Sequence, residues 1–136
     1  MKRYGEAADA YGRAIALGSS QGLGARLWPL YYERAVVLEE ADRWPEAKAD
    51  LNAALALAPD QPVILNFLGY AKLERGEDLD TAEAMIRKAS ALAPDDASIT
   101  DSLGWAIFKR GRTKEAIEIL SRAAKGDPAQ AEIHEH

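Results

Sequence analysis

The chain of 136 residues contains no cysteine and only two histidines. Without cysteine it has no disulfide, no thiolate metal ligand and no cysteine nucleophile. His134 and His136 stand two residues apart, and side chains at that spacing on a helix do not face the same way. Zinc usually takes three or four protein ligands. We therefore expect no metal site and no cofactor.

Long apolar runs are also missing. No run approaches the roughly 20 residues that a membrane-spanning helix needs. Residues 1–6 include charged side chains but are not followed by the apolar stretch of a signal peptide. We expect no direct membrane insertion by this segment. The compartment stays unknown at this point, because a reducing cytoplasm and an oxidising periplasm both tolerate a cysteine-free chain.

Basic residues are fewer than acidic residues in this chain. Lysine and arginine number 17 against 22 acidic residues, which gives a net charge of −5. Binding to nucleic acid needs a basic face, so we expect no nucleic-acid partner. Apolar residues make up 48% of the chain, more than a disordered sequence would carry, and the length is sufficient for one domain with a sizeable core.

Catalytic motifs are absent or incomplete. Residues 18–24 are rich in glycine, but they lack the Gly-Lys-Ser/Thr ending of a phosphate loop. Ser102 follows Asp101, yet no histidine is placed to activate it. The acidic pairs at 39–40 and 95–96 fit solvated helix ends and caps better than acid–base chemistry. We expect that the chain is not an enzyme.

What the sequence does contain is an internal repeat. Prolines recur at intervals of 35 and 34 residues, each five residues after an alanine. Two further rows of small residues keep intervals of 34 or 35. The four rows are Pro59, Pro94 and Pro128; Ala54, Ala89 and Ala123; Ala47, Ala82 and Ala116; and Ala35, Gly69 and Gly104.

Each unit predicts two helices. Ala82, Ile86 and Ala89 recur at i, i+4 and i+7, which is one face of a helix. Gly76 and Gly111 suit the end of the first helix in their respective units. Proline fits the first turn of a helix, and aspartate fits the capping position before it. The predicted starts use Pro45 and Pro62, and the predicted caps are Asp60, Asp78 and either Asp95 or Asp96.

This pattern resembles the tetratricopeptide repeat family, whose units carry a large residue, Leu-Gly, an aromatic, Ala, a large residue, Ala and Pro at fixed offsets. The matching positions are Tyr31, Arg34, Ala35, Leu38, Ala47, Leu51, Ala54 and Pro59; Leu65, Leu68, Gly69, Lys72, Ala82, Ile86, Ala89 and Pro94; and Thr100, Leu103, Gly104, Ile107, Ala116, Leu120, Ala123 and Pro128. Arg34, Lys72 and Thr100 depart from the pattern. The resemblance implies an all-α fold, a right-handed α-α superhelix of antiparallel helix pairs.

The resemblance covers nearly the whole chain and implies a division into repeats. The predicted parts are 1–18, the second helix of a truncated repeat; 28–60, 61–95 and 96–128, three repeats; and 129–136, the start of a further helix. The phrases at 65–70 and 101–105 are similar to the C-terminal repeats of proteobacterial multi-repeat proteins, some of them in the cell envelope. By that resemblance alone, the periplasm or cell envelope joins the cytoplasm as a candidate location.

In this family the first helix of each pair lines a concave groove, so the resemblance implies a scaffold or adaptor that binds a protein or peptide there. The predicted site residues are Tyr32, Val36, Asn66, Tyr70, Glu74, Asp101, Trp105, Phe108 and Lys109. Aromatic side chains with polar neighbours are typical of binding hot spots. Packing between adjacent helices is the alternative role for Tyr70 and Trp105, and for Phe108 it is the favoured one.

A structural role is the alternative function. Tyr4, Ala7 and Tyr11 match a second helix whose first helix is missing, and an exposed apolar edge invites association into a homo-oligomer.

Small residues at the helix contacts predict a close approach of the paired helices. We expect the substitution Gly69→Leu to overpack this contact at a cost of about 1–3 kcal/mol and so to lower the melting temperature.

Overall fold

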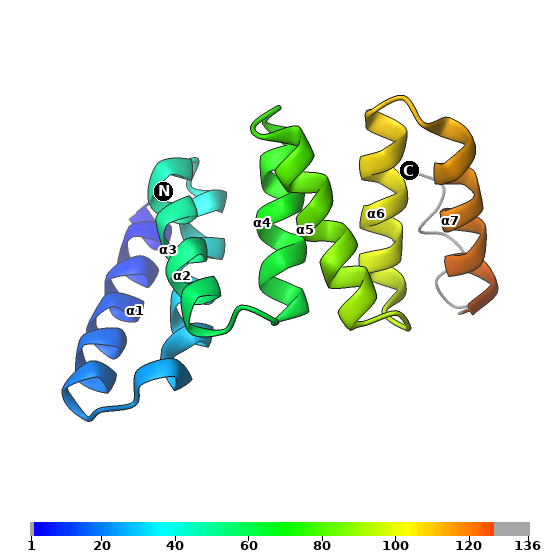
Figure 1. Cartoon of the computed structure of the whole chain (residues 1–136). Helices are drawn as coiled ribbons and strands as arrows, with labels where there is room; N and C mark the ends of the chain where they lie inside the picture. Colours follow the sequence, from blue (N-terminus) through cyan, green and yellow to red (C-terminus); the bar gives the residue numbers. More distant parts are fainter. Residues whose placement is uncertain (1, 127–136) are drawn as a thin grey trace. The chain divides into compact units, whose positions relative to one another are not determined.

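A computed structural model describes residues 2–126 of the chain. These residues form seven α-helices and one short 3-10 helix, with no strand among them (Figure 1). The elements are α1 (Lys2–Ser20), η1 (Gly24–Leu27), α2 (Trp28–Glu40), α3 (Trp44–Leu57), α4 (Pro62–Glu74), α5 (Leu79–Leu92), α6 (Ala97–Lys109) and α7 (Thr113–Gly126). Neighbouring helices pack as antiparallel pairs, which confirms the all-α prediction.

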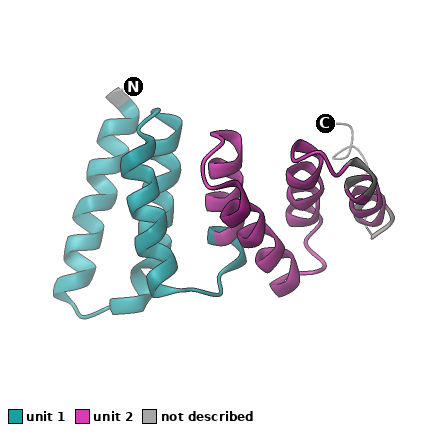
Figure 2. Ribbon diagram, turned by 45° about the horizontal axis from the view of Figure 1, so that its top comes forward, with its two compact units in different colours: residues 1–64 teal, residues 65–136 magenta. Residues whose placement is uncertain are grey.

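The chain divides into two compact units, residues 1–64 and residues 65–136, drawn in teal and magenta in Figure 2. Unit 1 contains α1 to α3, and unit 2 contains most of α4 and all of α5 to α7. The repeat boundaries stay a prediction. Several predicted positions lie outside the described residues or side chains: Pro128, residues 129–136 with His134 and His136, and the side chains of Ala116 and Ala123.

The helix ends follow the local sequence. Helix α4 begins at Pro62, as predicted, and α3 carries Pro45 in its first turn. The Asp96 carboxylate caps α6 by accepting a hydrogen bond from the Ile99 backbone N–H at 3.1 Å. Asp78 makes no such side-chain cap at α5, so that prediction is wrong. Asp78 instead has a positive φ of 47°, and its carboxylate accepts a hydrogen bond from Lys72 at 3.3 Å.

Turns between paired helices need a left-handed residue. Gly76 and Gly111 take φ values of 66° and 86° after α4 and α6, which confirms the predicted glycine turns. The corresponding turn of unit 1, seven residues after the small residue Ala35, places Asp42 at a φ of 61°. Aspartate is one of the few side chains that tolerate this region.

Unit 1 is held by small residues and one ion pair. Ala35, Ala47 and Leu51 are fully buried at the α2–α3 contact. Beside them, Arg34 on α2 donates two hydrogen bonds to the Asp50 carboxylate on α3, from Nε and from Nη2, each at 2.7 Å. The repeat pattern calls for an apolar residue at position 34.

Unit 2 has an apolar core with two close helix contacts. Its cluster comprises Leu73, Ala82, Ile86, Leu103, Ala106, Ile107 and Ile119. A Cβ atom on Gly69 would lie 2.8 Å from the Ala82 carbonyl oxygen, and a Cβ on Gly104 would lie 2.6 Å from Leu120 Cγ. Both distances are shorter than normal carbon contacts. The predicted close approach at these two glycines is confirmed.

A charged network joins α5 to the α6–α7 turn within unit 2. The buried Glu83 carboxylate accepts hydrogen bonds from Arg87 at 2.7 Å, from Arg110 at 2.9 Å and from Arg112. Burial alone would raise the pKa of Glu83, but the hydrogen bond from Arg87 and the charge of Arg112 outweigh it and lower that pKa. Glu83 is therefore charged in the folded protein at neutral pH.

Within residues 2–126, no helix is both long enough and apolar enough to cross a membrane.

Candidate peptide-binding site

The nine predicted site residues fall on three helices. Two of them lie on α2 in unit 1, and the other seven lie on α4 and α6 in unit 2. Those of unit 1 are Tyr32 and Val36, and those of unit 2 are Asn66, Tyr70, Glu74, Asp101, Trp105, Phe108 and Lys109. Unit 2 thus carries the main candidate site.

Glu74 connects the two helices of this site. Its carboxylate, at the end of α4, accepts hydrogen bonds from Lys109 Nζ at 2.7 Å and from Trp105 Nε1 at 3.3 Å, both on α6. The Tyr70 hydroxyl, one turn earlier on α4, also donates to it. The hydrogen bond from Lys109, helped by those from Tyr70 and Trp105, lowers the pKa of Glu74 against the opposing effect of burial. A charged Glu74 therefore fixes the orientations of three neighbouring side chains.

Two aromatic rings stack beside this carboxylate. The ring centroids of Trp105 and Phe108 lie 5.6 Å apart with the planes inclined by 18°. The Lys109 ammonium lies 5.9 Å from the centroid of the Trp105 ring. Phe108 is 46% exposed, so the core role favoured by the sequence pattern is wrong for this residue. The stacked pair presents an apolar surface with a cation next to it, an arrangement suited to cation–π and apolar contacts.

Tyr70 and Asp101 lie deeper in the site. Tyr70 packs against the apolar core of unit 2 while its hydroxyl reaches Glu74. Burial, followed by the hydrogen bond to Glu74, raises the pKa of Tyr70 to about 12. Asp101 is buried, and its negative charge contributes to the same shift. Asn66 Oδ1 is also buried and accepts no hydrogen bond from the described residues. Asn66 and Tyr70 are partly buried and Asp101 is buried, so all three are less accessible than Phe108.

The two predicted residues of unit 1 lie one turn apart on α2. Both Tyr32 and Val36 are partly buried. Burial, with a smaller contribution from the charge of Glu33, raises the pKa of the Tyr32 hydroxyl. Tyr32 therefore stays protonated and neutral at physiological pH.

Metal chemistry finds no support in the described part of the chain. Among residues 2–126, no three histidine, cysteine, aspartate or glutamate side chains gather where they could hold a metal ion. His134 and His136, at which the sequence predicts no metal site, lie outside these residues.

Comparison with protein families decides the identity of the fold. Residues 68–131 match the family model of the tetratricopeptide repeat, a stretch that includes the Glu74 site, Gly69 and Gly104. This stretch of the chain carries tetratricopeptide repeats. Members of this family are generally non-catalytic and typically mediate interactions between proteins.

Several solved structures share the fold of this chain. BtubC (BKLC) from P. vanneervenii matches with a TM-score of 0.81 at 19% identity over 96% of this chain and 59% of that one. YrrB, described as a TPR protein with an unusual peptide-binding site, matches with a TM-score of 0.76 at 20% identity over 97% and 64%. A MamA crystal structure matches with a TM-score of 0.66 at 23% identity over 77% and 57%.

The repeat protein described here spans less than two thirds of the length of these three structures. At such low identities the likeness shows the fold and not a shared partner. No curated protein sequence matched the chain.

Proposed function

We propose that this tetratricopeptide repeat protein is a non-catalytic interaction module, and that the α4–α6 face of unit 2 binds an extended or helical segment of a partner protein. The observation that carries the proposal is the stacked Trp105–Phe108 pair, with Phe108 46% exposed and the Lys109–Glu74 ion pair at its edge. Aromatic anchors ringed by polar groups are the usual hot spots of protein interfaces.

The site is also preorganised. Glu74 holds Tyr70, Trp105 and Lys109 through three hydrogen bonds before any partner arrives. Binding then orders few side chains, and each long side chain left mobile would otherwise cost about 0.5–1.5 kcal/mol on binding. The peptide-binding site ascribed to YrrB adds a precedent for peptide recognition by this fold.

A selection experiment tests this function. Random dodecamer peptides displayed on phage are selected against the protein, and the enriched peptides are synthesised and titrated by calorimetry. We expect Trp105→Ala to weaken the selected peptides by at least about tenfold, because truncating a central aromatic anchor costs about 2 kcal/mol or more. The double substitution Tyr70→Ala with Trp105→Ala is expected to abolish binding while circular dichroism stays helical.

Trp44→Ala is the matched control, because Trp44 is a partly buried tryptophan of α3 in unit 1 and takes no part in the Glu74 site. It should leave the affinity unchanged. Peptides that bind the double variant as tightly as the original protein, or a selection that enriches no peptide, would contradict the proposal.

Self-association is the second candidate function. Leu17 on α1 and Ile117 on α7 are 60% and 59% exposed, the highest values among the large apolar side chains in the described residues. They lie on the first and last described helices, where another copy of the chain could cover them. Light scattering coupled to size exclusion discriminates the two functions, since a strict monomer at high concentration would count against self-association.

A further inference from the structure

Two equivalent positions at the contact between paired helices carry charged residues in unit 1 and apolar residues in unit 2. Counted from the repeat alanines and glycines, Arg34 and Asp50 of unit 1 occupy the positions of Leu103 and Ile119 in unit 2. Leu103 and Ile119 are buried in the apolar cluster. The Asp50 side chain is only 9% exposed, so an ion pair has replaced apolar packing at a nearly dry position. Such a replacement brings little net stability.

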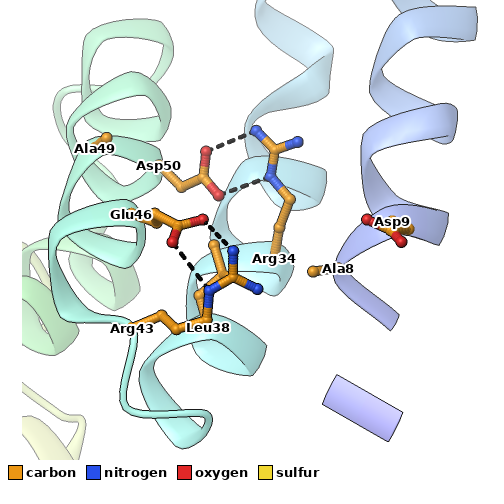
Figure 3. A pocket seen from close by; sticks show the side chains of 8 residues that line it. All are labelled: Ala8, Asp9, Arg34, Leu38, Arg43, Glu46, Ala49 and Asp50. Carbon is orange, nitrogen blue, oxygen red and sulfur yellow. Dashed lines mark hydrogen bonds and ion pairs between the residues drawn. The ribbon is translucent and has the colours of Figure 1, made fainter. Parts of the chain in front are cut away.

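Next to this ion pair the surface of unit 1 is hollowed. The pocket has a volume of about 350 Å³ and is lined by eight residues of α1, α2, α3 and the turn before α3, all labelled in Figure 3. This size falls in the range of about 300–1,000 Å³ that ligand sites occupy. Arg34 lies two residues after Tyr32, a rotation of about 200° around α2. The pocket therefore opens on a different face of α2 from the predicted groove.

The charges of the pocket do not balance. Arg34 is held by Asp50, and Arg43 donates two hydrogen bonds to Glu46, from Nε at 2.9 Å and from Nη2 at 2.7 Å. Asp9 projects from α1 on the opposite side of the pocket, and it has no ion-pair partner among the described residues (Figure 3). Three carboxylates thus share the pocket with two guanidinium groups that are already bound.

The remaining walls are apolar. Ala8 of α1, Leu38 of α2 and Ala49 of α3 line the pocket between the charged groups. An aliphatic stem would cover these side chains, while a charged head at its end would meet the excess carboxylate. A lysine or arginine side chain has this construction, with an apolar stem and a cationic tip.

We propose that the pocket between α1, α2 and α3 is a second binding site, one that receives a single lysine or arginine side chain of a partner protein. The stem contacts Leu38 and Ala49, and the cation binds Asp9. An anionic side chain would face the excess negative charge, and a purely apolar one would remove the carboxylate of Asp9 from water without a partner. The site does not depend on the α4–α6 face and stands if that face binds nothing.

Small capped amino acids test this proposal on the intact protein. The probes are Nα-acetyl-lysine amide and Nα-acetyl-arginine amide, with Nα-acetyl-norleucine amide and Nα-acetyl-glutamate amide as the apolar and anionic comparisons. Nitrogen–proton correlation NMR follows the backbone amides of Asp9, Leu38 and Ala49 during each titration. We expect saturable shifts of these amides with the two cationic probes and none with the other two.

Two variants complete the test. Asp9→Asn removes the unpaired charge at an exposed position and is expected to weaken the cationic probes by about twofold to fivefold, as for the loss of one partly exposed charge pair. Asp95→Asn, an exposed aspartate in the α5–α6 turn, is the matched control and should change nothing. The proposal is overturned if Asp9→Asn keeps the affinity, if norleucine or glutamate probes shift the same amides, or if no probe shifts them.

Discussion

Units 1 and 2 join their paired helices differently at equivalent positions. In unit 1, Arg34 and Asp50 link α2 to α3 through two hydrogen bonds of 2.7 Å, whereas in unit 2 Leu103 and Ile119 belong to one apolar cluster. The repeat period survives this exchange, so it depends on the small residues at the helix contact more than on the identity of the larger pair. The ion pair leaves unit 1 more sensitive to the loss of either member.

Removing one member of the ion pair should give the largest effect. Arg34→Leu leaves the Asp50 carboxylate buried without its partner. We expect a loss of about 3 kcal/mol in the free energy of unfolding, the lower end of the range for a broken buried pair, because Arg34 is partly exposed. Urea unfolding followed by circular dichroism measures this loss.

The double substitution Arg34→Leu with Asp50→Ile transplants the apolar pair of unit 2 into unit 1. It should restore or exceed the original stability, because well-packed apolar residues often replace a buried ion pair without loss. A double variant as unstable as the single one would show that unit 1 cannot use the packing of unit 2.

The two units also differ in the small residue at the contact between their paired helices. Ala35 of unit 1 already carries a Cβ in a fully buried position, whereas a Cβ on Gly69 would lie 2.8 Å from a backbone oxygen. Gly69→Ala should therefore cost about 1 kcal/mol, at the lower end of the range for overpacking, and Gly69→Leu about 3 kcal/mol, at its upper end. Gly104→Ala should cost less, since its nearest neighbour is the side chain of Leu120, which can rotate away. Thermal unfolding of the three variants ranks them, and equal melting temperatures would refute the distinction between backbone and side-chain neighbours.

The Glu83 network makes unit 2 sensitive to acid. The pKa of Glu83 in the folded protein lies below its ordinary value of 4.5. Its stabilising contribution is therefore present above pH 4.5 and is lost as the pH falls through the folded pKa. Glu83→Gln should cost about 2 kcal/mol at neutral pH and flatten the acid side of the stability curve. Melting temperatures measured from about pH 7 to about pH 3 test this. A parallel pair of curves for the original protein and the variant would contradict it.

The turns give the smallest predicted effect. Asp42 of unit 1 takes the left-handed conformation that Gly76 and Gly111 take in unit 2. Asp42→Gly should raise the free energy of unfolding by up to about 1 kcal/mol, because glycine adopts this region without strain. The matched exchange Gly76→Asp should lower it by a similar amount. If Asp42→Gly destabilises the protein, the aspartate side chain itself holds the turn.

The structural features that the sequence predicted correctly depend on residue type and on the repeat spacing. The start of α4 at Pro62, the turns at Gly76 and Gly111, and the close approach at Gly69 follow from residues near one another or from the repeat period. Each of these features depends on the backbone preference or the side-chain size of one residue type, which can be identified in the sequence. The tetratricopeptide fold follows from them.

The features that the sequence did not predict depend on contacts between separate helices. Arg34 departs from the repeat pattern, but its partner Asp50 is sixteen residues away and nothing in the spacing selects it. The position of Phe108, three residues after Trp105, suits either the core or the surface, and only the packed structure shows that it is exposed. The pocket beside Arg34 depends on α1, α2 and α3 together and has no signature in any one segment.

The indole N–H signals of the tryptophans test the central claim most directly. The protein has three tryptophans, and only Trp105 belongs to the α4–α6 face. Nitrogen–proton correlation NMR with a peptide selected against the protein should shift the Trp105 indole signal and leave those of Trp28 and Trp44 in place. A peptide that saturates the protein while Trp105 stays unmoved would show that the aromatic face of unit 2 is not the binding site.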